Sequence, residues 1–175
     1  LLTYVEAAMI RYGGDRFTSM QDRLTQQFTF LNEIEKLKIV YRRNRTIDRA
    51  RFENSAEHSW HVALMAIVLA EHADARGLDM FKVVKILLIH DLVEIYAGDT
   101  WLYDAAATNT QTVREQASAS TLYGLLPATQ ASEFTALWQE FEERSTPEAK
   151  FAAAIDALQP LVNHLLTGSP DDDGP

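Results

Sequence analysis

Apolar residues recur along most of this chain at the three- and four-residue spacing of an amphipathic helix. The clearest stripe lies between Leu24 and Ile39, and the most apolar stretch lies between Val62 and Ala70. The spacing predicts helices over residues 19–41, 55–76, 80–97, 111–124, 130–143 and from 147 onward. No stretch alternates between apolar and polar positions as a half-buried strand would. We therefore expect an all-α fold, a bundle of six or seven helices.

Capping residues mark where several of these helices begin and end. Asn54, followed three residues later by Glu57, has the form of a capping box. Asp79 is a candidate N-cap, and Gly98 supplies a stop signal at the other end of that helix. Thr146, followed by a proline and an acid, marks the start of the last helix.

The composition is that of a globular domain, with 47% hydrophobic and 23% charged residues among 175. The net charge of −9 argues against a nucleic-acid polymer as partner, because such surfaces are normally basic. The chain has no cysteine, which excludes disulfides and thiol catalysis. We expect no membrane partner, because no apolar run is long enough for a span. The N-terminus does not resemble a signal peptide, so we expect a cytoplasmic location.

Ionisable side chains gather at the end of the predicted helix over 80–97. They are His90, Asp91, Glu94 and Asp99. Burying a charge without a partner is expensive, and a divalent cation would be such a partner for a histidine nitrogen and a carboxylate oxygen. A His–Asp pair salt-bridged inside a helical core would satisfy the same groups. Two other predicted helices place His58 and Asp156 in apolar settings, and this convergence favours the metal.

Five arginines lie between Tyr41 and Arg51, which is unusual in an acidic chain. For most of them a solvated loop is a sufficient explanation. One of them could instead hold an anion, for which the planar guanidinium fork is suited.

Four sequence strings together resemble the HD-domain metal-dependent phosphohydrolases, in particular their 5′-deoxynucleotidase-like branch. Residues 52–59 (FENSAEHS) are similar to the first-histidine motif, and residues 89–99 (IHDLVEIYAGD) to the second motif. Residues 154–161 (AIDALQPL) are similar to the last motif, and residues 37–42 (LKIVYR) to a segment with a phosphate-binding arginine. The resemblance covers residues 24 to 167 and implies an HD-domain helical bundle.

The resemblance implies one divalent metal ion, held by His58, His90, Asp91 and Asp156. A mixed nitrogen and oxygen ligand set without thiolates suits Mn, Co, Fe, Ni, Zn or Mg, and the sequence does not choose among them. The resemblance also implies that Glu94 and Asp99 activate or orient the attacking water.

Arg42 matches the arginine that contacts the substrate phosphate in this family. The loop between Arg42 and His58 varies in length, so Arg43 or Arg45 could take that role instead. Trp60, Tyr96 and Trp101 lie near the motifs and could stack on a base, although we expect each of them in the core.

The implied activity is hydrolysis of nucleoside or deoxynucleoside 5′-monophosphates to nucleoside and phosphate. One alternative is another phosphate ester, such as a cyclic or triphosphate nucleotide. A noncatalytic nucleotide-binding protein is a second alternative, but it would not need Glu94 and Asp99. A di-iron oxygenase is disfavoured, because no histidine occurs from position 91 to position 163.

The chain divides into three predicted parts. Residues 1–18 form an N-terminal extension, residues 19–168 form the HD domain, and residues 169–175 form an acidic flexible tail. The partner implied by the resemblance is a small nucleotide substrate, and the family suggests a homodimer.

Overall fold

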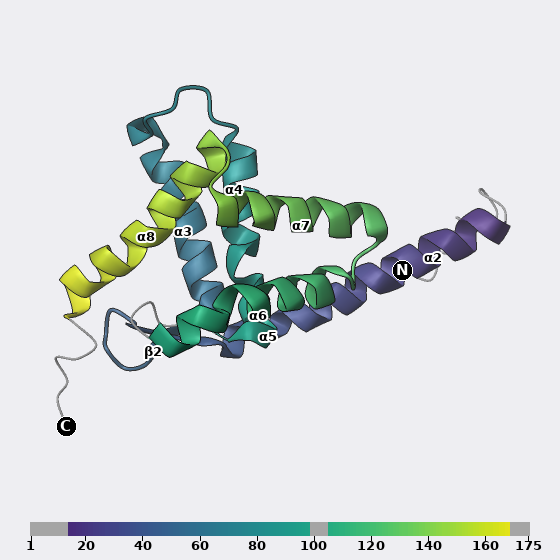
Figure 1. The fold of residues 1–175 in the computed structure, drawn as a ribbon, viewed down its shortest axis with the longest axis horizontal. Helices are drawn as coiled ribbons and strands as arrows, with labels where there is room; N and C mark the ends of the chain where they lie inside the picture. The colour runs from purple at the N-terminus through teal and green to yellow at the C-terminus, as the bar shows by residue number, and fades with distance from the viewer. Residues whose placement is uncertain (1–13, 99–104, 169–175) are drawn as a thin grey trace.

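The computed structural model describes residues 14–98 and 105–168, and most of these residues are helical (Figure 1). The α-helices are Gly14–Glu33 (α2), Ser55–Leu69 (α3), Met80–Ile89 (α4), Glu94–Ala97 (α5), Ala105–Tyr123 (α6), Ala128–Glu143 (α7) and Pro147–Thr167 (α8). The shorter elements are the 3₁₀ segments Ile34–Ile39 (η1), Ala70–His72 (η2) and His90–Val93 (η3), and the strands Tyr41–Arg45 (β1) and Phe52–Asn54 (β2). The predicted all-α fold is confirmed.

The core forms where α3 and α4 pack against each other and against α8, which crosses α3 in Figure 1. Val62 and Ala66 of α3 and Val83 and Leu87 of α4 are fully buried in it. The two positions in each helix are four residues apart, so each helix turns one apolar face inward. The same three helices lead to the predicted ligands, so core packing sets the distances between those residues.

Helix α6 packs against α5 and α7 and ties down the segment after α4. Tyr123, which is buried, donates its hydroxyl hydrogen to the Ile89 carbonyl oxygen at 3.2 Å. The buried Ser118 hydroxyl donates to the Val93 carbonyl oxygen. Two hydrogen bonds from one helix therefore hold the short segment that carries His90.

The capping box at the start of α3 is confirmed. The Glu57 amide donates to Asn54 Oδ1 at 3.0 Å, and the Asn54 amide donates to Glu57 Oε2 at 3.2 Å. This reciprocal pair satisfies two amides that the first helical turn leaves without partners. It fixes the turn immediately before His58.

The first long helix ends earlier than predicted, and a two-stranded antiparallel hairpin follows it. The helix ends at Glu33, and after η1 the backbone of Val40 is extended. Strand β1 then pairs with β2, with Tyr41 opposite Asn54. Our expectation of no strand was wrong because the arginine-rich strand β1 and the three-residue strand β2 lack an apolar alternation. Their backbone groups are satisfied by each other and by the adjoining turn, so no such pattern is needed.

The predicted helix over 80–97 also differs in its second half. Helix α4 ends at Ile89, and η3 and α5 carry the chain on to Gly98, whose positive φ of 76° ends the helix as predicted. A 3₁₀ segment has three residues per turn, so it changes where His90 and Asp91 point relative to a continuous α-helix.

Among the helices that the structure describes, none combines the length and apolar character that crossing a bilayer requires. Several predicted features lie outside the described residues: the first thirteen residues of the extension, Asp99, Trp101 and the tail over 169–175.

Candidate metal centre

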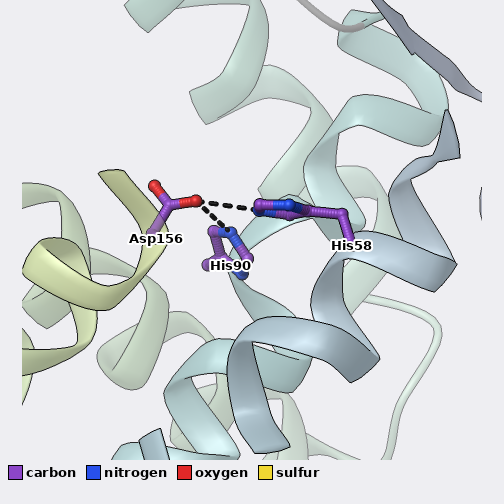
Figure 2. A group of neighbouring side chains, drawn as sticks. All are labelled: His58, His90 and Asp156. Carbon is purple, nitrogen blue, oxygen red and sulfur yellow. Dashed lines mark hydrogen bonds and ion pairs between the residues drawn. The ribbon is translucent and has the colours of Figure 1, made fainter. Parts of the chain in front are cut away.

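Three predicted ligands from distant parts of the sequence meet in the core. His58 lies in the first turn of α3, His90 begins η3 directly after α4, and Asp156 lies in the middle of α8. Asp156 Oδ1 is 2.8 Å from His58 Nε2 and 3.5 Å from His90 Nε2. Figure 2 shows both imidazole rings directed at this one carboxylate oxygen. One ligand atom from each residue lies within 4.8 Å of the other two, which is compatible with a single bound ion.

The other ring nitrogen of each histidine is fixed by an oxygen acceptor. His58 Nδ1 lies 3.1 Å from Gln159 Oε1, and His90 Nδ1 lies 2.8 Å from the Leu87 carbonyl oxygen. A carbonyl oxygen only accepts, so each Nδ1 carries the hydrogen and each neutral ring keeps its Nε2 lone pair. Both Nε2 atoms therefore face Asp156.

The fourth predicted ligand, Asp91, lies beside this cluster. Its Oδ1 is 3.1 Å from His90 Nε2, and its Oδ2 is 3.8 Å from His58 Nε2. Its Oδ2 also accepts a hydrogen bond from Arg42 Nη1 at 2.9 Å. Asp91 can thus present one oxygen to an ion and the other to the arginine.

The electrostatics of the cluster reflect its burial and its charges. Burial opposes ionisation of Asp156, yet the neighbouring His58 and His90 rings hold the pKa of this carboxyl well below its usual range. Burial likewise opposes protonation of His90, but the charges of Asp91 and Asp156 outweigh it and raise the pKa of His90 to about 9. The carboxylates thus attract a positive charge at this point.

The residues present fit a divalent cation. Among the described residues, His90 Nε2 is a buried polar atom that makes no hydrogen bond, although it faces two carboxylates. An unsatisfied buried group is costly, and a cation between the nitrogens and the carboxylates would satisfy it. Two imidazole nitrogens with carboxylate oxygens suit first-row divalent metals.

Cation binding should release a proton at neutral pH. Because the pKa of His90 is raised to about 9, the metal-free protein holds a proton that the cation must displace. The apparent affinity for Mn²⁺ should therefore rise by about tenfold per pH unit between pH 6.5 and 8.5. Titration calorimetry in buffers of different ionisation enthalpy counts the protons released. An affinity that stays constant over this range would contradict the expectation.

Of the three candidate arginines, Arg42 is the one that the structure places beside the predicted ligands. Its Nη1 is bonded to Asp91 Oδ2, and its Nε lies 3.9 Å from Glu53 Oε2. The Arg42 side chain is 16% exposed, whereas Arg43 is exposed and Arg45 donates to a backbone carbonyl of its own loop. The guanidinium thus lies at the edge of the metal centre, held from two sides.

Glu94 lies in the first turn of α5, three residues after Asp91. It is buried, and its Oε2 accepts a hydrogen bond of 2.6 Å from the hydroxyl of Ser55. Ser55 is fully buried at the start of α3, three residues before His58. The carboxylate is therefore anchored to the same turn that carries a predicted ligand.

Three residues that hold the site were assigned no role from the sequence. Glu53 and Ser55 lie inside the first motif string, and Gln159 lies inside the last. The available signal was their position: Gln159 is a polar residue in an apolar helix, three residues after Asp156 and on the same face. Nothing in the sequence showed which partner each would bond.

The expectation that the aromatic residues are core was wrong for two of them. Trp60 is 63% exposed, because the inward positions of α3 are taken by His58 and Val62. Tyr96 is 45% exposed, and its hydroxyl donates to Glu33 Oε1 at 2.5 Å. Neither ring therefore packs in the core.

A family model for the HD domain matches residues 34–173. The human 5′-deoxynucleotidase HDDC2 is 29% identical to this chain over 136 residues, covering 76% of the chain and 64% of that relative. The Xenopus laevis 5′-deoxynucleotidase HDDC2 is 29% identical over 113 residues, covering 65% of the chain and 54% of that relative. The chain therefore matches between half and two thirds of the length of these curated relatives.

Two solved structures are similar in fold. A predicted metal-dependent phosphohydrolase from Magnetospirillum magnetotacticum is 49% identical with a TM-score of 0.79, covering 83% of this chain and 72% of that one. A conserved hypothetical protein from Pyrococcus furiosus is 27% identical with a TM-score of 0.60, covering 83% of this chain and 89% of that one.

Proposed function

Because this chain belongs to the HD-domain family, we propose that it is a metal-dependent phosphohydrolase. Its proposed substrates are nucleoside 5′-monophosphates, deoxynucleotides included, which it hydrolyses to nucleoside and inorganic phosphate. The observation that carries the proposal is the convergence of His58 Nε2 and His90 Nε2 on one oxygen of Asp156. Relatives named as 5′-deoxynucleotidases support the choice of substrate class.

The ligands in this proposal are His58, His90 and Asp156, with Asp91 as the fourth. A divalent cation held there would polarise a phosphoryl oxygen and lower the pKa of a water molecule. The protein's own part is to orient the two rings: each Nδ1 hydrogen is held by a carbonyl oxygen, so Nε2 is the nitrogen of each ring that faces the cation.

Two further side chains act on the substrate in this mechanism. The Arg42 guanidinium binds the phosphate and neutralises charge that develops on its oxygens. Ser55 holds Glu94 in place. Glu94 accepts a proton from the attacking water while the oxygen of that water bonds to phosphorus. The ester bond to the 5′-oxygen breaks, and that oxygen takes up a proton from the solvent to become the nucleoside hydroxyl. Asp99 stays a predicted residue for activating or orienting the attacking water.

The test is phosphate release from a panel of ribo- and deoxyribonucleoside 5′-monophosphates. The protein is stripped of metal and reloaded with Mn, Co, Ni, Zn or Mg in turn. Metal-dependent release would support the proposal and rank bases and sugars. Stoichiometric metal binding without release from any monophosphate would exclude it. A second panel of cyclic and triphosphate nucleotides then distinguishes another phosphate ester from a noncatalytic nucleotide-binding protein.

Arg42→Lys should raise KM for the monophosphate by roughly 10- to 100-fold, since a lysine keeps the charge but loses the planar two-pronged donor. The same change at the exposed Arg43 is the matched control and should alter KM by less than about twofold. Steady-state kinetics at saturating metal measures both. A larger effect at Arg43 than at Arg42 would reassign the phosphate contact.

The proposal also covers the size of the substrate. We take the substrate to be a small nucleotide and not a nucleic-acid polymer, in keeping with the net charge of −9. The homodimer and the cytoplasmic location stay predictions.

A further inference from the structure

A buried carboxylate beside the metal centre has no role in the mechanism above. Glu53, in β2, is 8% exposed and lies between Arg42 and Gln159. We propose that Glu53 is a positioning residue that orients two functional groups at once: the ligand His58, through Gln159, and the phosphate-binding Arg42, directly. This inference rests on the proposed function, because it concerns how the metal ligand and the arginine are held.

The first branch runs from Glu53 through Gln159 to His58. Gln159 is 1% exposed, and its Nε2 donates to both Glu53 oxygens, at 3.1 and 3.4 Å. A carboxylate only accepts, so the amide must turn its NH₂ group to Glu53 and its oxygen to His58. That oxygen accepts from His58 Nδ1 at 3.1 Å.

The direction of this amide decides the tautomer of His58. With the amide reversed, its NH₂ group would face Nδ1, and the ring hydrogen of a neutral imidazole would move to Nε2. A protonated Nε2 cannot bind a metal. Glu53 therefore keeps the Nε2 lone pair of His58 available although it does not contact that nitrogen.

The second branch runs from Glu53 to Arg42 across the hairpin. Strand β1 pairs with β2, and Glu53 Oε2 lies 3.9 Å from Arg42 Nε. On its other side the guanidinium is bonded to Asp91 Oδ2. Glu53 Oε2 also lies 3.9 Å from His58 Nδ1, so a single oxygen is close to both branches.

Three variants separate the two branches, because Gln159 takes part in the first branch only. Gln159→Leu removes the acceptor of His58 but keeps the Glu53–Arg42 contact. Glu53→Gln weakens both branches, since its amide can turn either way and carries no charge. The double exchange of Glu53→Gln with Gln159→Glu rebuilds the first branch. A carboxylate at 159 accepts from His58 Nδ1 and from the new amide, while Arg42 still lacks its ionic partner.

The experiment measures two affinities on the full chain: Mn²⁺ by titration calorimetry, and inorganic phosphate on the Mn²⁺-saturated protein. Gln159→Leu should weaken Mn²⁺ binding by about 10- to 100-fold and leave phosphate affinity within about threefold. Glu53→Gln should weaken both. The double exchange should return Mn²⁺ affinity to within about threefold of wild type, with phosphate affinity still reduced. Glu71→Gln and Gln139→Leu are exposed controls, and circular dichroism checks folding.

The outcomes distinguish this inference from the proposed function. Wild-type Mn²⁺ affinity in Glu53→Gln and Gln159→Leu would overturn the inference and leave the metal centre intact. Failure of a folded double exchange to regain Mn²⁺ affinity would also overturn it, because the size and total charge are unchanged. A wild-type protein that binds no divalent metal would overturn the metal centre, and this inference with it.

Discussion

Asp156→Asn should reduce the affinity for a divalent cation by at least about 100-fold and lower phosphate release by about 1,000-fold or more. The two histidine Nε2 atoms face Asp156 Oδ1 from two other helical segments, at 2.8 and 3.5 Å. An amide of the same size removes the negative charge, and its NH₂ group can face the nitrogens in place of an oxygen. The metal ligands then lose the carboxylate that both histidines face.

The measurement is titration calorimetry with Mn²⁺, followed by phosphate release at metal concentrations up to 100 times the wild-type dissociation constant. Asp22→Asn, at an exposed position on α2, is the matched control and should behave as wild type. The fold of Asp156→Asn should persist without metal, because α8 remains anchored by buried apolar residues such as Ile155. A variant that binds Mn²⁺ as tightly as wild type would remove Asp156 from the ligand set.

Glu94→Gln should lower kcat by about 10²- to 10⁴-fold, the usual contribution of a general base. Glu94 is 9% exposed, and the Ser55 hydroxyl holds its Oε2 at 2.6 Å. Glutamine keeps the size and can still accept from Ser55, but it cannot take a proton. The loss should therefore fall on kcat, with KM changed by less than about threefold.

Steady-state kinetics over pH 5.5 to 9 on the metal-saturated protein tests this expectation. Glu71→Gln, whose side chain is 80% exposed, is the matched control and should leave kcat unchanged. The pH profile adds a second readout, because loss of the base should remove the acidic limb of kcat. If Glu94→Gln kept kcat within about fivefold of wild type, another group would have to accept the proton.

The helices were predictable because their signals are local. Val62 and Ala66, or Val83 and Leu87, stand at helical spacing, and the Asn54–Glu57 capping box needs no information beyond four residues. The hairpin was not predictable in the same way. Strand β1 has no apolar alternation, and its stability depends on pairing with β2, which only the folded chain provides.

The candidate ligands were predictable because ionisable residues in apolar helices need partners. His58, His90 and Asp156 each stand out from their neighbours for that reason. Their hydrogen-bond partners do not stand out. Gln159 and Glu53 are ordinary polar residues in the sequence, and their roles depend on side-chain directions that the core packing sets.

The sequence by itself determined the helical fold and the caps, and it singled out the candidate metal ligands. Only the tertiary structure decided that the partner oxygen of Asp156 lies between two Nε2 atoms, and that Arg42, of three candidate arginines, lies against Asp91. The physical reason is the distance along the sequence over which each interaction acts. Helical periodicity and capping act within a few residues, whereas the direction of a buried lone pair depends on contacts between segments about a hundred residues apart.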